Sequence, residues 1–260
     1  MAQKFYVVWQ GRETGIFTDW STCKKHIDHF PGARYKSFKT LSEAETAFKG
    51  GKSSPRKNST TRTGSMKHAV PAKKNGIKTY TASEIAAMKV DTKIYTDGGC
   101  EPNPGKAGSG LAIYRNDVID ELWYGLYNPK GTNNTAELNA LFQSLLIAKE
   151  EAEKGNTVAI FCDSKYSIQC VTQWAIGWEK KGWKKSGGEI KNLELIKEMF
   201  ALHQELKNKI KVLHVNGHVG VEGNELADRM SILAIESRET DFAPFREAFD
   251  IEAILATRAG

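Results

Sequence analysis

The chain has 260 residues, 40% of them hydrophobic, and a formal net charge of +6. This composition excludes an intrinsically disordered chain and supplies enough apolar residues for one large or two modest domains. Hydrophobic runs stay well below the ~18 residues of a membrane span, and the N-terminal residues lack the apolar core of a signal peptide. We therefore expect a cytoplasmic protein without a membrane partner, and the positive charge favours a polyanionic one.

Residues 1–50 predict a small domain with the element order ββαβα. Ser21 is expected to cap the first helix, and Ser42-Glu43-Ala44-Glu45 reads as a capping box that opens the second. Glycine-containing turns separate the strands. The expected strands are 5–9, 16–20 and 34–38, and the expected helices are 21–29 and 42–48.

Aromatic and basic residues are interleaved along this small domain. Aromatic faces stack on bases or sugars, and cations hold phosphates, so the pattern favours nucleic-acid binding. Some of the aromatics must instead fill so small a core. The aromatics are Tyr6, Trp9, Trp20 and Tyr35, and the cations are Arg12, Lys24, Lys25, Arg34 and Lys36.

Three motifs of the domain resemble the hybrid-binding domain at the N-terminus of type 1 ribonucleases H. The resemblance implies an RNA–DNA hybrid duplex as partner, with Tyr6 and Trp20 against the DNA strand and Arg34, Tyr35 and Lys36 near the hybrid. Ser37 replaces a frequent lysine of that family, and its effect is left open. The motifs are Phe5-Tyr6-Val7-Val8, Gly11-Arg12-x-Thr14-Gly15-Ile16-Phe17 and Phe30-Pro31-Gly32-Ala33-Arg34-Tyr35-Lys36-Ser37-Phe38.

Residues 51–90 predict a flexible basic linker. Lys and Arg are mixed with Ser, Thr, Gly and Pro, and no acidic residue occurs between Lys49 and Lys78. Such a segment buries too little apolar surface to order itself. Its charge either adds salt-sensitive attraction to nucleic acid or is simply solvated. Near its end, Thr81-Ala82-Ser83-Glu84 is expected to cap a short helix.

Residues 91–237 predict an α/β domain in which three consecutive strands precede alternating helices and strands. The first strand, Lys93-Ile94-Tyr95-Thr96-Asp97, is expected to end on its carboxylate. Gly98 and Gly99 would break the strand there and leave room for the backbone of a nucleic-acid strand. Further strands are expected at 108–115, 118–125, 157–163 and 211–215, and helices begin near 132, 164 and 224.

Four acidic residues stand on four different elements of this domain: Asp97, Glu137, Asp163 and Asp228. Each alone has an ordinary interpretation, such as a turn for Asp97 or a helix-dipole contact for Glu137. Gathered at the ends of parallel strands, they would repel by on the order of 4 kcal/mol for a pair ~4 Å apart at an effective dielectric of about 20. Mg²⁺ or Mn²⁺ relieves such repulsion, and two ions ~4 Å apart suit phosphodiester cleavage.

Residues 92–235 resemble a bacterial-type ribonuclease HI domain. The resemblance implies a five-stranded mixed sheet with its first three strands antiparallel and helices on both faces. It also implies an endonuclease that hydrolyses the RNA strand of RNA–DNA hybrids by two-metal-ion catalysis, leaving 5′-phosphate and 3′-OH ends. The motifs are Tyr95-Thr96-Asp97-Gly98-Gly99-Cys100, Thr132-Asn133-Asn134-x-x-Glu137-Leu138, Asp163-Ser164-x-Tyr166 and Gly217-His218-x-Gly220-x-x-Gly223-Asn224-Glu225-x-x-Asp228.

The same resemblance implies a role for each acid. Asp97 is expected to bridge two Mg²⁺ ions, which Mn²⁺ can replace. Glu137 and Asp163 are expected to hold the ion near the leaving group, and Asp228 the ion that activates the attacking water. Glu137 is also expected to contact the RNA 2′-OH. His218 is expected to serve proton transfer or product release.

Further residues are expected to bind the substrate by the same resemblance. Asn103, Asn133 and Asn134 are candidates for reading the RNA minor groove, and Thr132 and Asn192 for holding a phosphate of the DNA strand. A basic, Trp-rich segment resembles the protrusion that grips the DNA strand in this family. Its candidate contacts are Trp174, Lys180, Lys181, Lys184 and Lys185, while Lys165 and Val221 depart from a frequent Gln and His.

Two other classes of protein fit parts of the pattern. One is another nuclease of the same fold, such as a transposase or junction resolvase, and the Asn-Asn-x-x-Glu helix start argues against it. The other is a hybrid-binding protein without catalysis, and the four intact acids argue against it. We expect a monomer, and we assign no function to the C-terminal extension 238–260.

Overall fold

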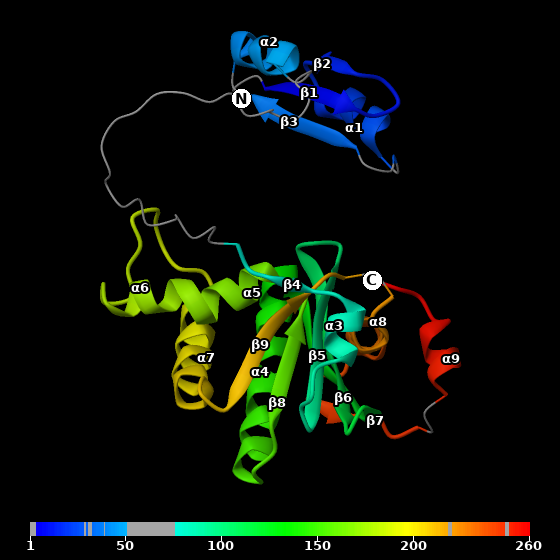
Figure 1. Ribbon diagram of the computed structural model, residues 1–260, viewed down its shortest axis with the longest axis vertical. Helices are drawn as coiled ribbons and strands as arrows, with labels where there is room; N and C mark the ends of the chain where they lie inside the picture. The colour runs from blue at the N-terminus through cyan, green and yellow to red at the C-terminus, as the bar shows by residue number, and fades with distance from the viewer. Residues whose placement is uncertain are drawn as a thin grey trace, which may run out of the picture. The chain divides into compact units, whose positions relative to one another are not determined.

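The computed structural model describes residues 4–28, 30, 33–38, 40–50, 76–217, 220–247 and 250–260. The chain divides into two units, Met1–Ala72 and Lys73–Gly260 (Figure 1). Residues 51–75, the greater part of the expected linker, lie outside the described residues. Among the residues described, no helix is long and apolar enough to cross a membrane.

The small unit is a three-stranded antiparallel sheet in the order β2-β1-β3. Its element order confirms the ββαβα prediction. Val8 of β1 packs on Cys23 and Ile27 of α1, and these three buried residues form a small core. The elements are β1 (Phe5–Gln10), β2 (Gly15–Phe17), α1 (Trp20–Ile27), β3 (Arg34–Phe38) and α2 (Leu41–Gly50).

Both helix starts in the small unit differ from the prediction. Asp19, rather than Ser21, caps α1, and its carboxylate accepts a hydrogen bond from the Thr22 backbone N–H at 2.8 Å. The capping box of α2 pairs Thr40 with Glu43, rather than Ser42 with Glu45. Each helix begins earlier than expected because an equally good acceptor precedes the predicted cap.

The large unit contains one mixed sheet in the order β10-β7-β6-β5-β8-β9-β4. Its five long strands confirm the predicted sheet, and β5, β6 and β7 are antiparallel as expected. Two strands of two residues each extend the edges. The strands are β4 (Thr79–Tyr80), β5 (Thr92–Glu101), β6 (Gly105–Arg115), β7 (Val118–Gly131), β8 (Val158–Cys162), β9 (Ile210–Val215) and β10 (Ala243–Pro244).

Residues 79–86 belong to the large unit rather than to a flexible linker, which corrects the predicted span of 51–90. β4 pairs in parallel with β9, so that Thr79 lies opposite His214. The capping box of Thr81 and Glu84 opens α3 (Ala82–Ala86), as predicted, and Ile85 is buried. A two-residue strand is too short to show a periodic sequence signal, and only its partner β9 reveals it.

Helices cover both faces of the sheet, as predicted. Because side chains alternate along a strand, Ile94 of β5 packs with α4 (Asn133–Glu153) and α7 (Leu193–Leu206). Its neighbour Tyr95 packs with α8 (Glu222–Ser237) on the opposite face. The sheet is therefore the middle layer of the unit.

Residues 165–179, which follow β8, form a continuous helical segment. It consists of α5 (Lys165–Gln169), a π-helical turn η1 (Cys170–Trp174) and α6 (Ala175–Glu179). A last helix, α9 (Ile251–Leu255), follows β10.

Candidate active site

Asp97 lies inside β5 rather than at its end, which corrects the prediction. β5 continues to Glu101 because its antiparallel partner β6 follows it that far. Its parallel partner β8 stops earlier, at the pair Thr96↔Cys162. Asp97 is thus the first residue of β5 beyond the parallel ladder, and the chain of β8 turns away beside it.

Gly98 and Gly99 make room for helices rather than for a nucleic-acid strand, which is a second correction. A Cβ added to Gly98 would lie 2.2 Å from the backbone nitrogen of Glu137 in α4. A Cβ added to Gly99 would lie 2.9 Å from the hydroxyl of Ser231 in α8. The two glycines therefore let both helices approach β5 closely, and this brings their acids beside Asp97.

Glu137 projects from the second turn of α4, whose N-terminus Thr132 caps by accepting from the Thr135 N–H at 3.2 Å. It is 6% exposed, and its Oε2 finds no hydrogen-bond partner among the described residues. Burial raises the pKa of Glu137 well above its usual value, and the charges of Asp97 and Asp163 raise it further. A buried, unpartnered carboxylate oxygen favours a bound cation.

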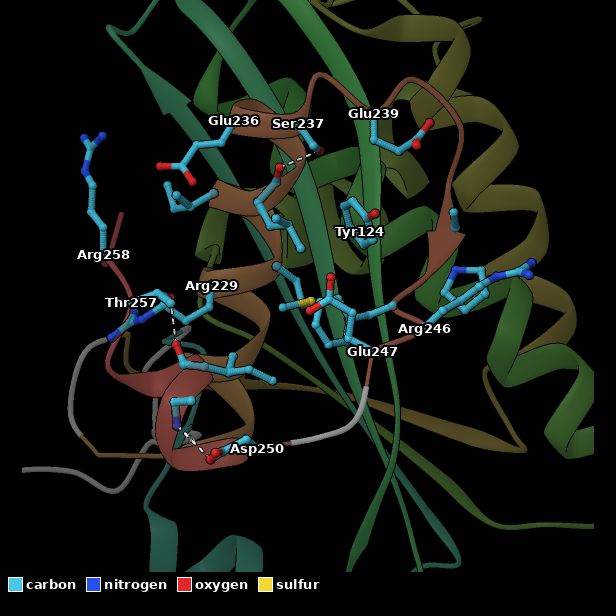
Figure 2. Close-up of a pocket in the computed structure, with 18 residues that line it drawn as sticks. Tyr124, Arg229, Glu236, Ser237, Glu239, Arg246, Glu247, Asp250, Thr257 and Arg258 are labelled. Carbon is cyan, nitrogen blue, oxygen red and sulfur yellow. Dashed lines mark hydrogen bonds between the residues drawn. The ribbon is translucent and has the colours of Figure 1, made fainter.

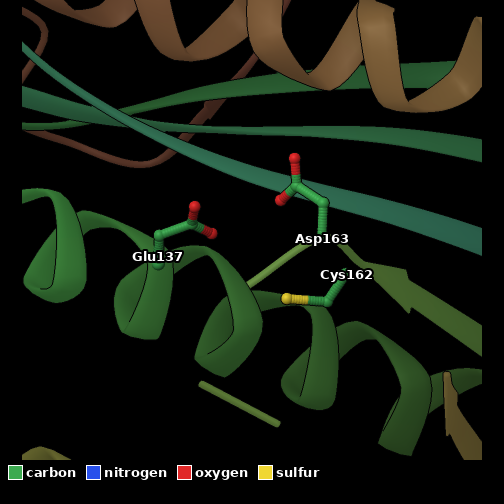
Figure 3. Close-up of side chains that lie close together, drawn as sticks. All are labelled: Glu137, Cys162 and Asp163. Atoms are coloured by element: carbon green, nitrogen blue, oxygen red, sulfur yellow. The ribbon is translucent and has the colours of Figure 1, made fainter. Parts of the chain in front are cut away.

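Asp163 follows β8 directly, and its carboxylate points toward the same space as Glu137 (Figure 3). Asn224 of α8 donates to its Oδ2 at 3.4 Å. His214 of β9 lies 3.1 Å from its backbone oxygen and 2.8 Å from the hydroxyl of Thr79. The end of β8 is therefore held by two neighbouring strands and a helix.

Asp228 of α8 completes the group. It is 5% exposed and pairs with Arg229, whose Nη1 lies 2.5 Å from its Oδ2. All four predicted acids line one pocket of about 410 Å³. The structure thus brings together Asp97, Glu137, Asp163 and Asp228, as the sequence predicted.

The charges of neighbouring acids raise the pKa values of Asp97 and Glu137. Burial raises the pKa of Asp97 well above its usual value, and the charges of Asp163 and Asp228 add to this, while a hydrogen bond from Ser231 opposes it. Carboxylate oxygens are the ligands that Mg²⁺ and Mn²⁺ prefer. Buried like charges, together with an Oε2 of Glu137 that has no hydrogen-bond partner among the described residues, fit a divalent cation that neutralises them.

Cys162 is a neighbour of the acids that the sequence did not single out. Its Sγ and one oxygen each of Glu137 and Asp163 lie within 4.8 Å of one another (Figure 3). Burial raises the pKa of its thiol, and the charge of Glu137 raises it further. The thiol is therefore held neutral, and a neutral thiol is a poor ligand for a hard cation.

Several predicted substrate contacts lie around the pocket. Asn133 lines it, and its backbone N–H donates to the side-chain oxygen of Asn103 at 3.2 Å. Thr135 joins Thr132 to Asn192, because its hydroxyl lies 2.8 Å from that of Thr132 and donates to Asn192 at 3.1 Å. Asn134 is exposed beside them. Thr132 and Asn192 are thus linked through Thr135, and their shared phosphate contact stays a prediction.

The basic segment after η1 presents its cations to solvent. Trp174 is 37% exposed and lies 5.9 Å, between ring centroids, from Trp178. Trp178 packs against the core, so of these two rings only that of Trp174 is free for a ligand. The exposed lysines of the segment are Lys180, Lys181, Lys184 and Lys185.

Three predicted aromatic residues form a cluster on the small unit. The ring of Trp20 lies 5.4 Å from that of Tyr6 and 5.8 Å from that of Tyr35. Trp20 and Tyr35 are 44% and 48% exposed, although aromatic residues of their size usually bury. Arg34 and Lys36 flank Tyr35 on the exposed strand β3. His218, by contrast, lies outside the described residues.

Sequence reasoning missed four residues that line the pocket: Glu101, Ile232, Arg258 and Gly260. Arg258 forms an ion pair with Glu101. The Gly260 backbone N–H donates to both carboxylate oxygens of Asp228 at 3.1 Å. A glycine at the end of a polar segment carries no sequence signal for such a contact.

Comparison with known proteins agrees with both units. A family model described as RNase H matches residues 89–236, and one described as Ribonuclease H1 N-terminal domain matches residues 4–48. The chain is similar to Ribonuclease H1 of Rattus norvegicus, with 32% identity over 255 residues that cover 87% of each chain. It is also similar to Ribonuclease H of Acidovorax sp. (strain JS42), with 38% identity over 144 residues that cover 55% of this chain and 93% of that protein.

A solved structure shares the fold. LC9-RNase H1, a type 1 RNase H with the type 2 active-site motif, matches with a TM-score of 0.50 and 22% identity. The match covers 64% of this chain and 81% of that chain.

Proposed function

Because the chain belongs to the ribonuclease H1 family of endoribonucleases, we propose that it hydrolyses the RNA strand of RNA–DNA hybrids with two divalent cations. The observation that carries this proposal is the convergence of four carboxylates on one pocket, from β5, the end of β8, α4 and α8; three of them are buried and Asp163 is half-buried. Since burial and mutual repulsion raise the pKa values of Asp97 and Glu137, the site is built to gain from cation binding.

Each acid has a distinct place in this proposal. When bound, two Mg²⁺ ions, which Mn²⁺ can replace, would neutralise the developing phosphate charge and activate a water molecule. The charges of Asp163 and Asp228 both raise the pKa of Asp97. We therefore assign Asp97 to both ions. Glu137 and Asp163 would hold the ion on the leaving-group side, and Asp228 the ion beside the attacking water.

Attack by water at phosphorus would leave a 5′-phosphate and a 3′-OH. Asn224, by donating to Oδ2 of Asp163, holds that carboxylate in place. Glu137 and Asn133, which share the pocket wall, are the groups we assign to the RNA 2′-OH and the minor groove. His218 stays a prediction for proton transfer or product release.

The small unit would bind the hybrid. Its support is the exposed cluster of Tyr6, Trp20 and Tyr35, with Arg34 and Lys36 beside it. Stacking and phosphate contacts of this kind tolerate any sequence, which suits an enzyme that acts on hybrids in general. The exposed lysines of the basic segment would add contacts to the DNA strand. A monomeric state and a cytoplasmic location also stay predictions.

The proposal is tested with three labelled duplexes of one sequence: an RNA–DNA hybrid, an RNA duplex and a DNA duplex. With Mg²⁺, we expect internal cleavage of the RNA in the hybrid alone, and none with a chelator. Sensitivity of the product ends to phosphatase and to 3′-end ligation identifies the 5′-phosphate and 3′-OH. Equal cleavage of the RNA duplex would contradict the substrate assignment.

A further inference from the structure

Residues 250–260 form a segment that runs along α8 and ends at the acid pocket (Figure 2). Asp250 caps α9 by accepting from the Ala253 backbone N–H at 3.0 Å. Arg229 donates to the backbone oxygen of Leu255 at 3.2 Å. The residue that pairs with Asp228 thus also holds the helix that leads to the pocket.

Two of the last four residues of this segment, 257–260, line the acid pocket. Gly260 donates its backbone N–H to Oδ1 and Oδ2 of Asp228, both at 3.1 Å. Arg258 pairs with Glu101 on the opposite wall. We call these four residues the strap.

The strap and a cation compete for the same oxygens. An amide hydrogen carries partial positive charge, and here it points between the two oxygens that would ligate a cation. Gly260 also lies close, because a Cβ added to it would be 2.6 Å from Oδ1 of Asp228. A cation on Oδ1 of Asp228 requires the amide of Gly260 to move away, and a cation on Oδ2 also requires the Arg229 guanidinium to move.

The strap carries no large apolar side chain, and residues 257–260 are exposed. The apolar side chains of the preceding helix α9, Ile251, Ile254 and Leu255, are half-buried against the core. A cavity of about 770 Å³ lies between the segment and α8, with Met230, Leu233 and Phe245 in its wall (Figure 2). Displacing the strap therefore gives up few close apolar contacts.

We propose that the strap is an autoinhibitory device: in the substrate-free protein it occupies Asp228, and it must leave before Asp228 binds a divalent cation. This inference rests on the proposed function, since it assigns Asp228 to a metal ion. It predicts that the strap sets the metal concentration at which the enzyme becomes active, without changing the chemistry of the site.

The test measures Mn²⁺ binding to the substrate-free protein by calorimetry. Three forms are compared: the full chain, a variant ending at Ala256, and Arg258→Gln, which breaks the ion pair with Glu101. We expect truncation to tighten Mn²⁺ binding by roughly fivefold or more, the usual range of a coupling between two sites. Arg258→Gln should give a smaller change in the same direction. Arg246→Gln, which removes the same charge outside the acid pocket, should bind Mn²⁺ as the full chain does.

The metal dependence of hybrid cleavage gives a second readout. The truncated protein should reach half-maximal activity at a lower Mg²⁺ concentration, with an unchanged maximal rate. Far-ultraviolet circular dichroism and thermal unfolding check that both variants fold. Unchanged or weaker Mn²⁺ binding in the folded truncated protein overturns the proposal.

Asp97→Asn separates this inference from the proposed function. If Asp97→Asn binds Mn²⁺ as tightly as the native protein, the metal site itself is wrongly assigned. If Asp97→Asn loses binding while truncation changes nothing, the metal site stands and the strap does not inhibit it.

Discussion

The hydroxyl of Ser231 donates a hydrogen bond to Oδ2 of Asp97 at 3.2 Å, across the contact between α8 and β5. Ser231 is fully buried and stands three residues after Asp228 on the same helix. One turn of α8 therefore carries an acid of the pocket and the group that orients another. The close approach of α8, which Gly99 permits, makes this bond possible.

Replacing Glu137 should show the electrostatic cost of the metal-free pocket. The folded state raises the pKa of Glu137, so this acid favours folding below its ordinary pKa of 4.5 and loses that contribution as pH rises through the folded-state pKa. In chelator at neutral pH, Glu137→Gln should thus melt at a higher temperature than the native protein. The difference should shrink toward zero below pH 4.5.

Thermal unfolding across this pH range measures the effect. Glu153→Gln, an exposed change on the same helix, is the control and should leave the pH dependence as it is. Parallel curves for Glu137→Gln and the native protein would show that Glu137 pays no desolvation cost.

Gly98→Ala tests the close packing of α4 on β5. The added methyl group would lie 2.2 Å from the backbone nitrogen of Glu137, so the helix must shift. We expect a loss of about 2 kcal/mol or more in the free energy of unfolding, and reduced activity because Glu137 moves with the helix. Denaturant titration measures the first effect.

Gly177→Ala is the matched control, because a Cβ at this position of α6 meets nothing within 4 Å. It should be neutral or stabilising by up to about 1 kcal/mol. A Gly98→Ala protein as stable as Gly177→Ala would mean that α4 lies farther from β5.

Trp20→Ala tests the aromatic cluster of the small unit. Its ring is 44% exposed, so its loss should disturb the fold little and the affinity for hybrid more. We expect weaker binding by about 1–3 kcal/mol, the range for one stacked base. Leu41→Ala, an exposed apolar side chain of the same unit at 46%, should bind as the native protein does. Fluorescence anisotropy with a labelled hybrid measures both affinities. Equal losses of affinity in Trp20→Ala and Leu41→Ala would contradict a specific role of the Trp20 ring.

Deleting residues 1–50 should separate binding from chemistry. We expect weaker affinity for long hybrids and fewer cuts per encounter, with a nearly unchanged rate at saturating substrate. The difference between full and shortened chains should narrow as salt rises, since phosphate contacts release counterions. If the chain without residues 1–50 binds long hybrids as tightly as the full chain, the small unit has another role.

Much of the fold follows from local sequence patterns. The alternation of Ile94, Tyr95 and Thr96 predicts a strand buried on both faces, and the leucines of α4 repeat at helical spacing. β4 was not predicted because a strand of two residues is too short to show an alternating sequence pattern. The C-terminal end of β5 was predicted too early, because a strand continues as long as a partner pairs with it, even across glycines.

The acids were predictable as a set only by resemblance. Spacing alone left Glu137 as an ordinary acid near a helix start, and only the folded chain places it beside Asp97 and Asp163. The role of Gly98 depends on which helix crosses it, and a linear sequence does not contain that information. The contact of Gly260 with Asp228 is made by a backbone amide, which every residue type except proline supplies.

The central claim is that Asp97 is essential for metal-dependent cleavage and dispensable for hybrid binding. The direct measurement compares Asp97→Asn with the native protein on one labelled RNA–DNA hybrid, for cleavage with Mg²⁺ and for binding in chelator. We predict that cleavage falls by a factor on the order of 10³ or more, while affinity changes by less than about threefold. Undiminished turnover by Asp97→Asn would contradict the metal assignment.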